Sequence, residues 1–149
     1  MTVIVKKISD TWLALGLAAH FVAKHKPFSH FPAGDLIRTL SNQIHRNHYF
    51  FAFDTSADPA RVVGYFGWAL YNHAAADTFS ATGQPPTEEL TMGGDVLWVL
   101  TAVTEHRLAF PMLGKSIRTL YPTYRVMAIR HKANGKRITL NLNPVSHRS

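Results

Sequence analysis

The stretch Gly93–His131 constrains the fold more than any other part of the chain. It opens with a Gly-Gly-Asp turn signal, and the run Val96–Val103 that follows is apolar apart from one hydroxyl. Such a run is typical of a strand buried on both faces. The pattern then predicts a helix over Ala109–Leu120 and a second strand over Tyr124–Ile129. Strand, crossover helix and strand in this order predict a βαβ unit of an α/β or α+β protein.

The rest of the chain is expected to complete one α+β domain over residues 1–149, with a mixed, mostly antiparallel sheet flanked by helices. The expected elements are a helix capped by Ser9 or Asp10 and ending near Lys24, a helix from Asp35 to about Arg46, a hairpin of Tyr49–Phe53 and Val62–Tyr71, a surface connection over Ala74–Thr91, a turn at Asn134-Gly135 and an edge strand over Lys136–Leu142. The apolar positions of the first helix recur at helical spacing, at Trp12, Leu13, Leu17, Phe21 and Val22.

Composition excludes several classes of protein. Hydrophobic residues make up 46% of the 149 residues and charged residues 17%, which favours a compact globule. Cysteine is absent, so disulfides and thiolate nucleophiles are excluded. No apolar run approaches the roughly 20 residues that a membrane-spanning helix needs, and no membrane span is expected. The N-terminal residues lack the order of a secretory signal, so the expected location is cytoplasmic.

The charge balance is strongly basic. Sixteen Lys and Arg against nine Asp and Glu give a net charge of +7, and such a surface attracts a polyanion or simply aids solubility. The chain contains no helix-turn-helix or RNA-recognition signature, so nucleic acid is not the expected partner.

Short motifs, taken in order, resemble one known family. They are Asn47-His48-Tyr49, Val63-Gly64-Tyr65-Phe66-Gly67-Trp68-Ala69, Gly94-Asp95 followed by Trp98, Tyr121-Pro122, and Ala128-Ile129-Arg130. Their order and spacing, with thirty residues between Trp68 and Trp98, resemble the toxin-activating lysine acyltransferases that modify RTX (hemolysin-type) protoxins. The resemblance covers roughly Ala18 to His131. It implies a GNAT-like acyltransferase fold, in which the sheet splays between its fourth and fifth strands to admit an acyl thioester.

The resemblance also implies an activity. A fatty acyl group would move from acyl carrier protein to the ε-amine of an internal lysine of a protoxin, without a permanently bound cofactor. Enzymes of this fold that use CoA cradle its pyrophosphate with a glycine-rich loop, whereas Glu105–Gly114 offers one late glycine. A carrier protein as donor is therefore favoured, and its acidic surface suits a basic enzyme.

A histidine base is expected, because a lysine amine with a pKa near ~10.4 must lose a proton to attack a thioester. In the family a catalytic histidine follows the first helix in the pattern His-Arg/Lys-x-aromatic. His25-Lys26-Pro27-Phe28 matches this pattern by residue type, and the neighbouring His30-Phe31-Pro32 matches it almost as well. Both His25 and His30 are therefore candidates. His20, His25 and His30 do not form a metal site, since five-residue steps turn a helix by roughly 140°.

The chain departs from the family at the residue that works with the histidine. The family has an aspartate six residues after the Gly-Asp motif, and here that position is Thr101. Threonine can hydrogen-bond a ring, but it cannot supply the negative charge that stabilises an imidazolium. Glu105, four residues further on, is the candidate substitute if the end of the strand curls inward. Otherwise Thr101 is an ordinary β-branched strand residue.

Further candidates concern the acyl chain and its carrier. Trp68 and Trp98 are expected to pack in the core in any case, and the resemblance implies that they wall an acyl channel. Gly64 and Gly67 leave room for a close-lying chain or a bulge. Arg130 ends the last strand of the βαβ unit and is a candidate contact for a phosphopantetheine phosphate.

Three functions remain open at this point. The first is the lysine acyltransferase, and the second is a noncatalytic relative that binds acyl carrier protein or a client protein. A small-molecule N-acetyltransferase is the third, disfavoured by the missing phosphate cradle. Exposed edge strands are compatible with a homodimer.

Overall fold

The computed structural model describes residues 2–83, 94–131 and 137–143. In this part of the chain four α-helices and one short 3₁₀ helix accompany a mixed sheet of six strands, so the protein is α+β as predicted. The elements are β1 (Val3–Lys6), α1 (Thr11–Val22), the 3₁₀ helix η1 (Phe28–His30), α2 (Ala33–His45), β2 (Tyr49–Asp54), β3 (Arg61–Tyr71), α3 (His73–Thr82), β4 (Val96–Thr104), α4 (Ala109–Leu120), β5 (Arg125–His131) and β6 (Arg137–Asn141).

The strands follow one another across the sheet in chain order, from β1 to β6. The pairs β1–β2, β2–β3 and β5–β6 are antiparallel. β4 and β5 are parallel, with Val96–Val99 opposite Arg125–Ala128. The parallel pair joined through α4 confirms the predicted βαβ unit, and the position of β6 at the end of the order confirms an edge strand.

The chain divides into two compact units, which are described one at a time. The first contains Met1–Trp68 and Thr101–Ile117, and the second contains Ala69–Leu100 and Arg118–Ser149. The single domain predicted over residues 1–149 stays a prediction. Among the described helices, none has the length and apolar character required to cross a membrane.

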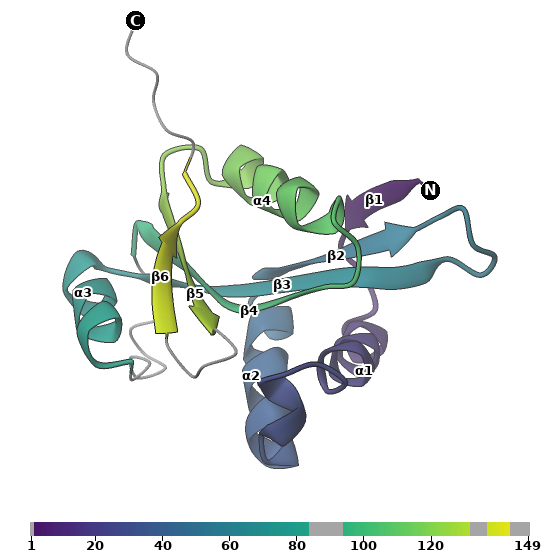
Figure 1. Cartoon of the computed structure of the whole chain (residues 1–149), viewed down its shortest axis with the longest axis horizontal. Coiled ribbons are helices and arrows are strands. Elements are labelled where there is room, and N and C mark those ends of the chain that lie inside the picture. Colours follow the sequence, from purple (N-terminus) through teal and green to yellow (C-terminus); the bar gives the residue numbers. More distant parts are fainter. Residues whose placement is uncertain (1, 84–93, 132–136, 144–149) are drawn as a thin grey trace, which may run out of the picture. The chain divides into compact units, whose positions relative to one another are not determined.

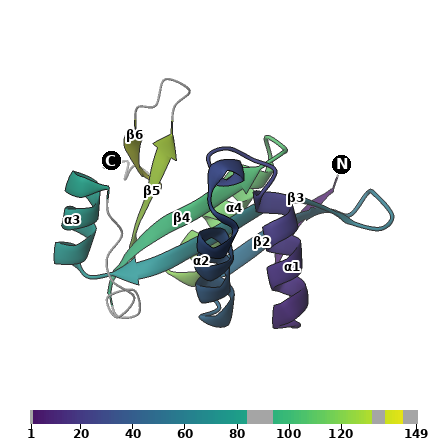
Figure 2. The same ribbon diagram turned by 90° about the horizontal axis from the view of Figure 1, so that it is seen from below.

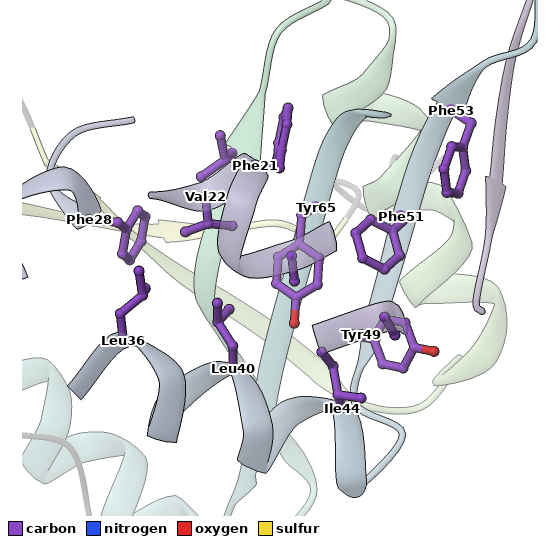
Figure 3. Close-up of a cluster of buried hydrophobic side chains, with 13 residues drawn as sticks. Phe21, Val22, Phe28, Leu36, Leu40, Ile44, Tyr49, Phe51, Phe53 and Tyr65 are labelled. Carbon is purple, nitrogen blue, oxygen red and sulfur yellow. The ribbon is translucent and has the colours of Figure 1, made fainter. Parts of the chain in front are cut away.

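Helices cover both faces of the β2–β3 hairpin in the first unit. α1 and α2 lie side by side on one face and α4 lies on the other (Figure 1, Figure 2). The core between the helix pair and the hairpin is aromatic on the strand side and mostly aliphatic on the helix side (Figure 3). Its labelled members are Phe21 and Val22 of α1, Phe28 of η1, Leu36, Leu40 and Ile44 of α2, and Tyr49, Phe51, Phe53 and Tyr65 of the hairpin.

α1 begins where the sequence predicts, and of the five apolar positions named at helical spacing it buries Phe21 and Val22 but exposes Trp12 and Leu13. The Asp10 carboxylate accepts hydrogen bonds from the N–H groups of Trp12 and Leu13, so Asp10 is the N-cap. The residues that α1 buries are Ala14, Ala18, Phe21 and Val22. Trp12 and Leu13 are exposed. Two small residues, Ala14 and Ala18, thus face the core in place of the large residues Trp12 and Leu13.

In the second unit α3 packs on β4. The ring of Phe79 in α3 stacks on Trp98 at 4.8 Å between centroids, with an angle of 8° between planes. Val96 and Met127 join the same buried cluster from β4 and β5. A Cβ at position 94 would lie 1.7 Å from the carbonyl oxygen of Tyr71, so only glycine fits at this position.

The helix α3 and the strand β1 were not predicted from the sequence. The segment Ala74–Thr91 was expected to be an irregular connection, which is wrong for its first half, because α3 occupies His73–Thr82. Asn72 caps this helix through a bond from the Ala75 N–H. The strand β1 was not foreseen. Gly93, the Asn134-Gly135 turn and the second half of the connection lie outside the described residues.

Candidate functional site

His25 and Glu105, eighty positions apart in the sequence, form a close pair in the first unit. The Nε2 atom of His25 lies 2.8 Å from Oε1 of Glu105. The two side chains are 29% and 32% exposed, so each is accessible to solvent and each is also packed on one side. A histidine in contact with a carboxylate is the usual arrangement of a general base and the group that orients it.

The position of His25 follows from the end of α1. The His25 N–H donates to the Val22 carbonyl at 3.1 Å, and the His25 carbonyl accepts from the Ser29 N–H at 2.8 Å. The imidazole packs against the ring of Phe21, with 5.2 Å between centroids. Because Phe21 is buried in the core, both the backbone and the ring of His25 are fixed by parts of the fold that do not depend on a ligand.

Glu105 is held just beyond the end of β4. Its backbone N–H donates to the Val63 carbonyl of β3 at 2.8 Å, which ties this residue to the hairpin. The side chain is therefore presented at the end of a strand instead of inside the sheet. Glu105, the substitute carboxylate suggested for the case that the strand end curls inward, thus lies beside His25.

Thr101 lies elsewhere, within the buried interior. It is completely buried, and its Oγ1 accepts a hydrogen bond from Nε2 of Gln43 at 3.0 Å. The Oε1 atom of Gln43 accepts from the Tyr65 hydroxyl at 2.8 Å. Burial, with a smaller effect of Tyr49, raises the pKa of the Tyr65 phenol well above its usual value, which keeps this donor protonated. Thr101 thus belongs to a buried polar network.

The glycines of β3 fit their neighbours closely. A Cβ on Gly67 would lie 1.8 Å from Oε1 of Gln43, so the amide occupies the space that Gly67 leaves. A Cβ on Gly64 would lie 2.9 Å from Leu113 and 3.3 Å from Ala109, both in α4. Gly67 therefore admits α2, and Gly64 admits α4. The predicted use of this space for an acyl chain stays a prediction.

His30 is the weaker of the two histidine candidates by its surroundings. It is the last residue of η1, it is exposed, and its backbone N–H donates to the Pro27 carbonyl. No carboxylate lies within ion-pair distance of its ring in the ranges that the structure describes. The structure thus gives His25 a charged partner that His30 lacks.

Trp68 is buried among charged and aromatic neighbours. Its ring stacks on His48 at 6.1 Å and contacts Phe50 at 5.5 Å, and the Lys7 ammonium lies 6.0 Å from its centre. Burial, together with the smaller effects of the Arg46 and Lys7 charges, lowers the pKa of His48 to about 4. His48 is therefore a neutral, buried imidazole at neutral pH.

Trp98 and Arg130 belong to the second unit. Trp98 is buried, and its indole Nε1 has no hydrogen-bond partner among the described residues. Arg130 stands opposite Ile138 in the β5–β6 register, and its side chain lies outside the described part of the chain. Their predicted roles toward the acyl chain and its carrier stay predictions.

Gln43 and Lys7 were not among the residues singled out from the sequence, and His48 and Tyr65 were named only as members of the resembling motifs. For Gln43 a signal was present, since it is a polar residue on the face of α2 that buries Leu36, Leu40 and Ile44. A polar side chain on such a face needs a buried partner.

The site contains an imidazole in contact with a carboxylate, and no three His, Asp or Glu side chains gather into a metal-binding group within the described ranges. The sequence matches no model of a known protein family and no curated protein. What the site does must therefore be inferred from the geometry of the pair and from the motifs in the sequence.

Proposed function

We propose that the chain is a lysine acyltransferase of the toxin-activating type, which moves a fatty acyl group from acyl carrier protein to an internal lysine of an RTX-type protoxin. The observation that carries the proposal is the 2.8 Å contact between His25 and Glu105. It lies in the segment where the resembling family has its catalytic histidine. It also supplies the negative charge that Thr101 cannot supply.

The contact favours Nδ1 of His25 as the base. With Nε2 directed at the carboxylate, the Nε2 proton is donated to Glu105 and Nδ1 carries the lone pair. Nδ1 takes a proton from the lysine ammonium and passes it to solvent, the freed amine attacks the thioester carbonyl, and a C–N bond forms. The C–S bond then breaks as the nitrogen loses its second proton, which passes through Nδ1 to the leaving thiolate. Glu105 stabilises the imidazolium formed in this step. The chain has no cysteine, so the acyl group passes directly to the amine without a thioester on the enzyme.

The arrangement of elements supports a GNAT-like fold for this protein. The parallel pair β4–β5 with α4 between them in sequence is the part of that fold from which a sheet can splay. The antiparallel strands β1 to β3 precede this pair in the sheet, as the fold requires. Fold alone does not define activity, so the His25–Glu105 pair remains the principal argument.

The test is transfer of labelled acyl groups from acyl carrier protein to a candidate protoxin. We expect His25→Gln and Glu105→Gln to lower the transfer rate by about 100-fold, the usual contribution of a general base and its partner. The His30→Gln variant is the matched control and should transfer at the wild-type rate. Loss of transfer in His30→Gln with full activity in His25→Gln would contradict the assignment of the base.

One observation favours a second function. The position of the family's aspartate is taken by Thr101, whose hydroxyl is engaged by Gln43 in the core. A noncatalytic relative that binds acyl carrier protein or a client protein would have no need of a carboxylate there. Carrier binding without any transfer of label, in the wild type and in both variants, would support this alternative.

A further inference from the structure

We propose that the same site hydrolyses its acyl thioester donor when no lysine acceptor is bound. This inference rests on the proposed function for the identity of the donor, but it concerns a different reaction, with water as the acceptor. The substrate class is a fatty acyl thioester, and the products are a free fatty acid and a thiol.

The carboxylate that contacts His25 lies near the surface. Thr101 is completely buried inside β4, whereas Glu105 lies beyond the end of that strand with a side chain that is 32% exposed. The partner of His25 is thus near the surface, and the imidazole itself is 29% exposed. A carboxylate at position 101 would lie in the dry interior, while the pair that the chain does contain is in contact with bulk water.

Water and an amine make similar demands on the base. Each must give a proton to Nδ1 of His25, since Nε2 is engaged by Glu105. An enzyme normally excludes water from a reactive thioester by closing its site. A pair with about a third of each side chain exposed has no such protection unless a bound partner covers it, so water reaches the base whenever the acceptor protein is absent.

The reaction balances without a further reagent. Nδ1 of His25 removes a proton from water, the oxygen attacks the thioester carbonyl, and a C–O bond forms. The tetrahedral intermediate then expels the thiolate as the C–S bond breaks, and the proton on His25 passes to the sulfur. Glu105 stabilises the imidazolium between the two proton transfers, and no electrons are gained or lost.

The experiment measures thiol release from the acetyl, octanoyl and palmitoyl thioesters of N-acetylcysteamine, with the full chain and no acceptor. We expect release above the buffer rate in the wild type and a loss of about 100-fold in His25→Gln and Glu105→Gln. His20→Gln is the matched control, because His20 is an exposed histidine of α1 that is not a member of the pair, and its rate should equal that of the wild type.

A second variant guards against misfolding. His25→Ala removes the ring from a partly exposed position, so added imidazole should reach the gap and restore thiol release. Circular dichroism of each variant establishes that the fold is retained. Thiol release that stays at the wild-type level in His25→Ala, or a folded His25→Ala protein that imidazole does not rescue, overturns the inference.

The outcomes separate this inference from the proposed function. Transfer to lysine with no thiol release in the absence of acceptor overturns the hydrolysis and leaves the acyltransferase standing. Thiol release that depends on His25, without transfer to any protein, supports the hydrolysis and removes the acyltransferase. A wild-type protein that neither transfers nor releases thiol overturns both.

Discussion

Gln43 of α2 is the polar residue that links this helix to β3 and β4 inside the first unit. Its amide joins the Thr101 and Tyr65 hydroxyls, at 3.0 and 2.8 Å, in a region from which water is excluded. A buried amide with both ends bonded fixes the position of its helix, because each unmade bond would cost about 1–3 kcal/mol. The absence of a side chain at Gly67 is what makes room for it.

We therefore expect Gly67→Ala to destabilise the protein by about 2–4 kcal/mol. The new methyl group would collide with the Gln43 amide and displace it from at least one of its partners. Gly16→Ala is the matched control, since nothing lies within 4 Å of a Cβ at this position of α1. That change should stabilise the helix by about 0.5–1 kcal/mol. Urea unfolding measures both, and equal stability of the two variants would contradict the packing described.

At this scale the sequence indicated the candidates and suggested Glu105 as a partner for a histidine, but it did not distinguish His25 from His30. His25 and Glu105 were both named, since residue type and motif suggest a base and a carboxylate. Their pairing depends on β4 ending before residue 105 and on the residues after α1 bringing His25 back over Phe21. Such a contact between distant segments leaves no periodic signal in either of them. The fixed place of Thr101 within a polar network was equally invisible.

At the scale of elements, periodicity succeeded where the pattern was long. α4 runs over Ala109–Leu120 as predicted, because Ala109, Leu113 and Ile117 recur at helical spacing. α3 was not predicted, because the Gly-Gln-Pro-Pro sequence that follows it indicates a loop, and its alanine-rich segment was assigned to that loop. β1 was not predicted, because its four residues, Val3–Lys6, carry too little alternation to indicate a strand. Short elements depend on the partners they find in the sheet.

The start of α1 gives a prediction at this scale. Asp10→Ala should cost about 1 kcal/mol, since two helical N–H groups lose their acceptor and the helix dipole loses a negative charge near its N-terminus. The neighbouring Ser9 was an equal candidate for the cap in the sequence, and it does not fill that position. Ser9→Ala is thus the matched control and should change the unfolding free energy by less than about 0.5 kcal/mol. Chemical denaturation distinguishes the two, and a larger loss in Ser9→Ala would refute the cap assignment.

At the scale of the whole molecule, the excess of positive charge is the property that bears most on which partners the protein attracts. A net charge of +7 steers acidic partners toward the protein and does so less at high salt. Two exposed lysines, Lys24 and Lys26, flank His25 directly. The charges that any acidic carrier meets on its way to the proposed base therefore include these two.

The double variant Lys24→Glu/Lys26→Glu should slow association with acyl carrier protein by about tenfold at low salt. The effect should shrink as the salt concentration rises, because screening weakens interactions between exposed charges. Arg61→Glu changes an exposed cation at the start of β3 and is the matched control, with a smaller effect expected. Stopped-flow fluorescence measures the association rate, and an unchanged rate in the double variant would show that charge near His25 does not guide the carrier.

The pH dependence of stability follows from His48. Its pKa falls from 6.5 to about 4 in the folded protein, mainly because of burial. Between these two values the unfolded chain binds more protons than the folded one, so stability is fully present above pH 6.5 and decreases as the pH falls toward 4. We expect this group to remove about 2 kcal/mol over that interval.

His48→Phe should flatten that part of the stability curve, since Phe keeps a ring beside Trp68 and has no proton to gain. His20→Gln is the matched control at an exposed position of α1 and should leave the curve unchanged. Urea unfolding at pH 7 and pH 5 tests both, and an equally steep decline in His48→Phe and the wild type would assign the acid sensitivity to other groups.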